Sequence, residues 1–260
     1  MALSATVKNI AGAAIFASAF TLNSLPAYAE ATNSDEEWEF MLAPLFLWGI
    51  NIGGDATLDG NTADLNLDFQ DNVLKNMDAF FTLHFEAKKG DLVLFAEYQH
   101  VNLDPSMSTS VGPIPVNADI DFKVEMAEFG AGYTLSDVDN VRWEVLGGLR
   151  WNSHDIDVTI TSIGPFPGKV IGGDEWFQAF VGGRVFAPIA NNWTFIGRSD
   201  IAYGGSDNAA FHLNLMADYR FNEWGSVFGG YRYMMFDYSD NSYAYNAAQH
   251  GPMLGIGFYW

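Results

Sequence analysis

Apolar and polar residues alternate with a period of two along nearly the whole chain after residue 37. This period is typical of β-strands that carry one apolar and one polar face. It predicts ten strands, at residues 38–53, 78–88, 91–103, 116–135, 141–160, 175–188, 193–204, 209–221, 225–238 and 249–260. An even number of such strands predicts an all-β fold, a transmembrane antiparallel up-and-down β-barrel.

The connections between the predicted strands are alternately short and long, apart from one tight turn at residues 204–207. The short ones lie at 88–91, 136–140, 190–192 and 222–224, and the long ones at 54–77, 104–115, 161–174 and 239–248. Outer-membrane barrels have short periplasmic turns and longer extracellular loops. We therefore expect the first strand to run outward and the chain to end at the periplasmic side.

One segment departs from this rhythm. Residues 62–69 alternate like an eleventh strand, and residues 70–77 resemble a short helix. An eleventh strand would place the C-terminus outside, so we predict that residues 54–77 form an extracellular excursion that folds over or into the barrel. Barrels of eight or twelve strands are also compatible with the pattern.

The last strand indicates which face meets lipid. Leu254, Ile256, Phe258 and Trp260 share one face, and an exposed apolar strand of this kind would promote aggregation of a soluble protein. A soluble barrel with the opposite facing remains the alternative. Aromatic residues near strand ends favour the membrane barrel, because such barrels carry aromatic girdles at both interfaces; these residues are Trp38, Trp48, Trp193, Tyr219, Phe221, Trp224 and Trp260.

With the apolar faces outward, the lumen receives the charged residues of the strands. Buried charges persist only when they are paired and hydrogen-bonded, which guanidinium and carboxylate groups do well. Two interpretations stay open: a ladder that fills the barrel, or a narrow polar passage for small solutes or ions. The predicted lumen network contains Glu86, Glu97, Glu125, Glu144, Asp200 and Asp218 with Arg142, Arg150, Arg184, Arg198, Arg220 and Arg232.

The start of the chain carries a targeting pattern. Lys8 precedes the apolar run at residues 10–20, and a small-x-small motif ends at Ala29. We interpret residues 1–29 as a cleaved secretory signal peptide and residues 30–260 as the barrel domain. No other segment has 18 consecutive apolar residues.

Charge and motifs exclude several functions. With 12 basic and 32 acidic residues, the net charge of −20 repels nucleic-acid backbones and suits outer-membrane lipid and lipopolysaccharide bridged by divalent cations. Cysteine is absent and the five histidines form no close pair, so we predict no metal and no cofactor. No nucleophile elbow or phosphate loop occurs, and we do not expect an enzyme.

Two alternatives of other classes remain. His154-Asp155 near the predicted extracellular rim fits a protease or lipid-modifying barrel enzyme. Loops 104–115 and 161–174 fit a surface adhesin.

Several segments resemble a known group of proteins. They are Phe46-Leu-Trp48-Gly49, Trp176-Phe-Gln-Ala-Phe-Val-Gly-Gly183-Arg184, Gly230-Tyr231-Arg232 and Gly251-Pro252-Met-Leu-Gly255. Together with the signal peptide they look like the small outer-membrane β-barrel proteins of Gram-negative bacteria, the broad group with OmpW-like and OmpA-like membrane domains. The ending Gly255-x-x-Phe258-x-Trp260 is similar to the signal read by the barrel assembly machinery, although the family usually ends in Phe. The resemblance implies an integral outer-membrane protein with a structural role or passive solute passage, and it names neither the solute nor the oligomeric state.

Overall fold

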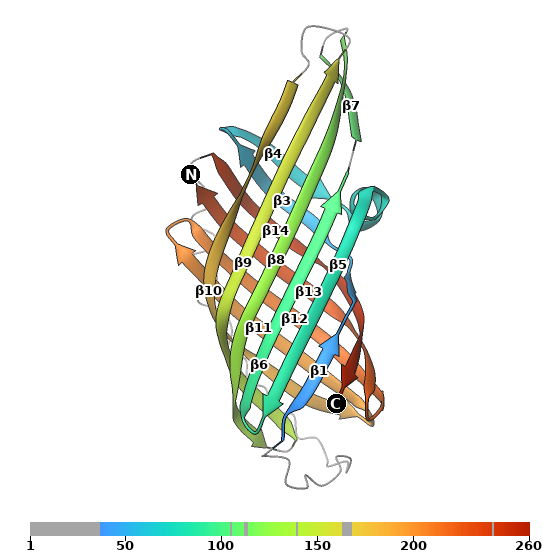
Figure 1. Cartoon of the computed structure of the whole chain (residues 1–260), viewed down its shortest axis with the longest axis vertical. Coiled ribbons are helices and arrows are strands. Elements are labelled where there is room, and N and C mark those ends of the chain that lie inside the picture. The colour runs from blue at the N-terminus through green and yellow to red at the C-terminus, as the bar shows by residue number, and fades with distance from the viewer. Residues whose placement is uncertain (1–36, 105, 112–113, 139, 163–167, 241) are drawn as a thin grey trace. The chain divides into compact units, whose positions relative to one another are not determined.

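The computed structural model describes residues 37–104, 106–111, 114–138, 140–162, 168–240 and 242–260, which form a closed antiparallel β-barrel (Figure 1). The predicted signal peptide lies outside these residues. The strands are β1 (Glu39–Ala43), β2 (Phe46–Trp48), β3 (Asn51–Leu58), β4 (Asn61–Leu67), β5 (Met77–Lys89), β6 (Leu92–Leu103), β7 (Ser106–Val111), β8 (Ile114–Val138), β9 (Val141–Ser162), β10 (Gly168–Ala190), β11 (Trp193–Gly205), β12 (Asn208–Asn222), β13 (Gly225–Asp240) and β14 (Tyr243–Tyr259).

The barrel closes through its first and last strands. β1, β2 and β3 follow one another along β14, and all three pair with it. β1 also pairs with β5 on its other side, which completes the ring. Counted as one wall strand, β1 to β3 join β5, β6 and β8 to β14 in a barrel of ten strands, as the sequence pattern predicts.

Residues 62–69 are a correction to that pattern. Residues 61–67 form β4, a strand that folds back on β3 as a hairpin, so this part of the predicted excursion is a strand and not a loop. The turn uses Asp59 and Gly60, both with positive φ, as two-residue hairpins require. β4 does not enter the count of wall strands, because among the described residues it pairs with β3 alone.

A helical connector links β4 to β5, as the sequence predicts. It consists of a π-turn η2 (Phe69–Val73) and a 3₁₀ turn η3 (Leu74–Asn76). Asp68 begins the connector, because its carboxylate accepts the backbone N–H groups of Gln70 and Asp71. No helix among the described residues is long and apolar enough to cross a membrane.

Several strands are longer than predicted. β8, β9 and β10 have 25, 22 and 23 residues, about twice the 9–11 that a membrane crossing needs. The outward apolar residues of β9 extend from Trp143 to Trp151 and give way to Ser153 and Asp155. These strands therefore continue beyond the lipid. The long connection expected at 239–248 is wrong as well, because β13 and β14 extend through it to the paired residues Asp240 and Tyr243.

The exterior of the wall is apolar, as predicted. Trp260 is 61% exposed at the barrel end that carries the short turns, and it stacks on Phe40. Leu254, Ile256 and Phe258 likewise point outward. Other exposed apolar side chains of the wall include Leu92, Phe129, Tyr133, Trp143, Leu149, Phe177, Val181, Ile201, Leu215 and Val227.

The prediction that Trp48 belongs to an aromatic girdle is wrong, because its side chain points into the barrel and is only 3% exposed. The cause lies at Pro44, where the strand bends between β1 and β2. Ala43 and Phe46 are both buried, although strict alternation would put them on opposite faces. The added residue shifts every later inward position of this wall strand by one.

Candidate functional site: the barrel interior

Charged side chains fill the middle of the barrel. Arg150, with no exposed side-chain surface, bridges Glu128 at 2.6 Å and Asp200 at 2.8 Å. Arg198 contacts the same two carboxylates at 3.0 and 2.8 Å. His212 adds a third contact to Asp200, at 2.9 Å. The two guanidinium groups and two carboxylates form a closed ring of charge-assisted hydrogen bonds from β8, β9 and β11.

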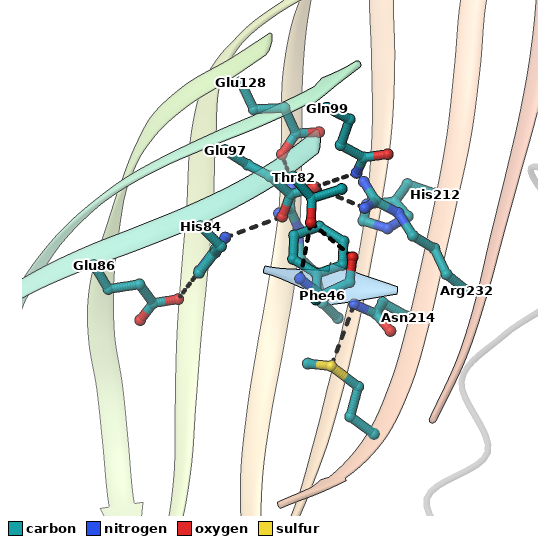
Figure 2. Close-up of polar contacts among 12 residues, drawn as sticks. Phe46, Thr82, His84, Glu86, Glu97, Gln99, Glu128, His212, Asn214 and Arg232 are labelled. Atoms are coloured by element: carbon teal, nitrogen blue, oxygen red, sulfur yellow. Dashed lines mark hydrogen bonds and ion pairs between the residues drawn. The ribbon is translucent and has the colours of Figure 1, made fainter. Parts of the chain in front are cut away.

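A second chain of ion pairs crosses the same layer. His84 lies between two carboxylates, 3.0 Å from Glu86 and 3.0 Å from Glu97 (Figure 2). Glu97 also accepts from Arg232 at 2.6 Å, and Glu86 pairs with Arg184. Because both ring nitrogens of His84 face acceptors, the geometry fits an imidazolium ion.

The second chain continues from Arg184 to Glu144 and ends at Arg142, on the side of the short turns. We call all these side chains the ionic cluster: Glu86, Glu97, Glu128, Glu144, Asp200, Arg142, Arg150, Arg184, Arg198, Arg232, His84 and His212. Five carboxylates meet five guanidinium groups, so the buried charge is nearly balanced.

Aromatic side chains fill the interior toward the long connections. Trp176 stacks on Tyr238 with ring centroids 4.2 Å apart, and His154 packs edge-on against Tyr245 at 4.5 Å. The His154 Nδ1 atom lies 2.6 Å from the hydroxyl of Tyr243. We call this group the aromatic cluster: Phe122, His154, Trp176, Phe236, Tyr238, Tyr243 and Tyr245.

Little free space separates the two clusters. A pocket there, lined among others by Trp48, Gln99, Met126, Asn152 and Gln249, has a volume of about 20 Å³. That is room for about one water molecule. This pocket is therefore too small for a solute much larger than water.

The predicted lumen residues lie inside the barrel with one exception. Arg220 points inward and stacks over Tyr259 at 3.6 Å, and Asp218, two residues earlier, is 8% exposed on the same face. Glu125 is the correction, because it lies on the outer face, where it pairs with His100 at 3.1 Å and accepts from Tyr98 at 2.6 Å. It is three residues from the inward Glu128, an odd spacing that puts the two on opposite faces of β8.

The rim pair His154-Asp155 does not form a site. His154 is buried in the aromatic cluster, whereas Asp155 is exposed on the outer face, near Lys123. Consecutive residues of a strand point to opposite faces, so these two side chains cannot act on one substrate atom. Among the described residues, no group of three or more His, Cys, Asp or Glu side chains is placed to hold a metal ion.

The C-terminal motif has a structural setting. Gly255 faces inward against the ring of Phe228 and the Cβ of Phe46, so a side chain there would clash. Phe258 stacks on Trp224 at 6.1 Å on the outside. Recognition of the C-terminal motif by the barrel assembly machinery stays a prediction.

No family model matches the chain, and no curated protein sequence matches it. Solved structures do resemble it. The translocator domain of the autotransporter NalP from Neisseria meningitidis is 12% identical, with 87% of this chain and 90% of that chain covered and a TM-score of 0.50. The outer-membrane protease OmpT from Escherichia coli is 10% identical over 88% and 98% of the two chains, with a TM-score of 0.49. Ail, the attachment invasion locus protein of Yersinia pestis, is 11% identical over 86% and 99%, with a TM-score of 0.37.

At these identities the likeness concerns the fold alone, that of an outer-membrane β-barrel. The resemblance to OmpW-like and OmpA-like domains stays a prediction. The closed wall of ten strands and the apolar exterior lead to the same class. The chain is an outer-membrane β-barrel protein.

Proposed function

We propose that this protein is a structural outer-membrane barrel whose lumen is closed to solutes. The observation that carries the proposal is the filled interior. The ionic cluster crosses the barrel from β5 to β13, and the aromatic cluster covers it toward the long connections. A solute on the axis would have to displace both.

The charges of the ionic cluster support a ladder more than a selectivity filter. Arg150 and Glu128 are each at most 2% exposed and are engaged with one another. An open polar passage needs groups that exchange their partners with water or ions. Guanidinium groups held by two carboxylates do so at a large cost, because each release leaves a buried charge unpaired.

Planar-bilayer recording tests this proposal directly. Folded, purified protein should add no steady current across a lipid bilayer, whichever salt is used and at either polarity of the applied voltage. A porin of known conductance in the same bilayer checks the insertion. Reproducible unit currents from folded protein would overturn the closed lumen and would support the narrow passage for small ions.

A double variant separates filling from conduction. Arg198→Leu with Asp200→Leu removes a guanidinium and its carboxylate together, so few charges are left unpaired. We expect lower thermal stability and still no current. The matched control is Lys123→Leu with Asp155→Leu, a pair 3.9 Å apart on the outer face. Current that appears only in the interior variant would show that a passage lies just behind these two side chains.

A surface-binding role is the second candidate, and the length of β8 to β10 favours it. These strands carry a sheet beyond the lipid, edged by β7, which pairs with β8 alone among the described residues. Leu103 pairs with Phe122, so a two-residue turn can replace residues 104–121, and this replacement should abolish binding of lipopolysaccharide or of cells. Binding that survives this replacement would contradict the adhesive role.

A further inference from the structure

The barrel wall contains a junction at which main-chain pairing stops. β1 and β5 pair over five residues, from Glu39 with Lys88 to Ala43 with His84. Beyond that point, β2 pairs with β14 and the rest of β5 pairs with β6. Among the described residues, no main-chain pairing joins 45–50 to 77–83. We call these two segments the unpaired junction.

Pro44 explains why the pairing ends here. Proline has no backbone N–H to donate, and it lies at the bend that separates β1 from β2. One side chain replaces the ladder. The Phe46 N–H donates to Thr82 Oγ1 at 2.8 Å, and the Thr82 hydroxyl donates to the Phe46 carbonyl at 2.6 Å (Figure 2). The wall is thus held at this point by a threonine hydroxyl.

The lining of the unpaired junction is apolar. Leu45, Leu47 and Phe81 point outward and are 50%, 53% and 45% exposed. Leu47 lies opposite Leu254, a lipid-facing residue of β14, so the lining continues the apolar exterior. Behind it, Phe46 is buried in the hydrophobic core of the barrel.

The connector between β4 and β5 bounds the junction on the side of the long connections. The ring of Phe69 lies against Gly49 and would meet any side chain placed there. Its N–H donates to the side chain of Asn51 at 2.9 Å, and Asn51 donates to the carbonyl of His250 at 3.1 Å. Val73 is buried in the hydrophobic core. The connector is therefore fixed to β3 and β14 and packs into the core.

From this arrangement we propose that the unpaired junction binds one acyl chain of a membrane lipid. The chain enters between Leu47 and Phe81 and reaches Phe46 and Thr82. Leu45, Leu47 and Phe81 carry no charge and continue the lipid-facing exterior, so hydrocarbon is the ligand that meets them. Asp78 is the one charged residue of the two segments, and it lies exposed beside the connector. Phe46 and Thr82 are 2% and 0% exposed, so the chain reaches them when the contact between their strands opens.

Lipids with a photoactivatable diazirine at the end of an acyl chain test this proposal. The protein is reconstituted in bilayers that contain such a phosphatidylcholine, irradiated, and mapped by mass spectrometry of its peptides. We expect label on the inward residues Phe46 and Thr82 in addition to outward ones. The inward residues Leu146 and Phe180, behind fully paired strands, serve as the control and should carry none. Label confined to outward side chains would overturn the site.

Two substitutions of Thr82 sharpen the test. Thr82→Val keeps the shape and removes the hydroxyl that joins β5 to β2, so label on Phe46 should rise about tenfold, the change that 1.4 kcal/mol produces. Thr82→Ser keeps the hydroxyl and should label like the original protein. Equal labelling of all three would show that the junction does not admit the chain. If Thr82→Val does not fold, the contrast of Phe46 with Leu146 decides alone.

Discussion

The ionic and aromatic clusters fill the same barrel in different ways. In the ionic cluster each group is held by ion pairs with specific side chains, as Arg150 is held by Glu128 and Asp200. In the aromatic cluster the rings of Trp176 and Tyr238 pack by shape, and the polar contact of His154 with Tyr243 is secondary. Charges tolerate the loss of a partner poorly, because an unpaired buried charge costs far more than a lost contact. Aromatic packing loses energy in proportion to the contact removed.

The strongest test of this contrast removes one charge from the ionic cluster. Arg150→Met leaves Glu128 and Asp200 buried with one fewer partner each. We expect a loss of about 3–5 kcal/mol in the free energy of unfolding, measured with urea in lipid bilayers. A loss below that of an aromatic-cluster or core substitution would show that water or relaxation compensates the charge, and the contrast would fail.

Met234→Ala tests apolar packing in the core beside the aromatic cluster. Met234 is fully buried in the hydrophobic core, next to the inward Arg232 and Phe236 on the same strand. Removal of its side chain creates a cavity, and we expect a loss of about 2–5 kcal/mol in the same unfolding measurement. The partly exposed Met235 gives a matched Met235→Ala control on the outer face, with a smaller loss.

The alternation of the sequence predicts most of this interior and also explains where prediction fails. It correctly places the charges of β9 to β13 inside, because each strand keeps one parity across its charged residues. The register shifts lie near strand ends, after Pro188, Tyr203 and Arg220. The prediction that Glu125 lies in the lumen is wrong, and the sequence itself contains the reason. Glu125 and Glu128 have opposite parity on the same strand, so they cannot both point inward. The inward orientation of Trp48 could be predicted only if the bend at Pro44, which shifts the alternation by one residue, were known.

Other features have no local signal. Arg150 and Asp200 are 50 positions apart, and their contact depends on the stagger of strands around the barrel. Tyr243 and Tyr245 lie in a segment that the sequence assigned to a long connection. The pattern thus gives faces but neither cross-barrel partners nor the extent of strands beyond the lipid. The unpaired junction was missed for the same reason, since pairing is a property of neighbours.

A conservative change tests whether the ionic cluster depends on guanidinium geometry. Arg184 donates to Glu144 through Nε at 2.9 Å and pairs with Glu86 through its terminal nitrogens. Arg184→Lys keeps the charge but cannot span both carboxylates. We expect a loss of about 1.5–3 kcal/mol, the worth of one hydrogen bond to a charged group, by urea unfolding. An unchanged midpoint would indicate that charge alone suffices.

The smallest effect should come from an ion pair of similar composition outside the barrel. Lys123 and Asp155 are 3.9 Å apart on neighbouring strands, with side chains 40% and 62% exposed. Water screens such a pair, so Lys123→Ala should change the free energy of unfolding by about 0–1 kcal/mol. Raising the salt concentration should abolish even that change, while the loss from Arg150→Met should persist. If both losses fell equally with salt, the ionic cluster would be reached by ions, and burial would not be what separates the two pairs.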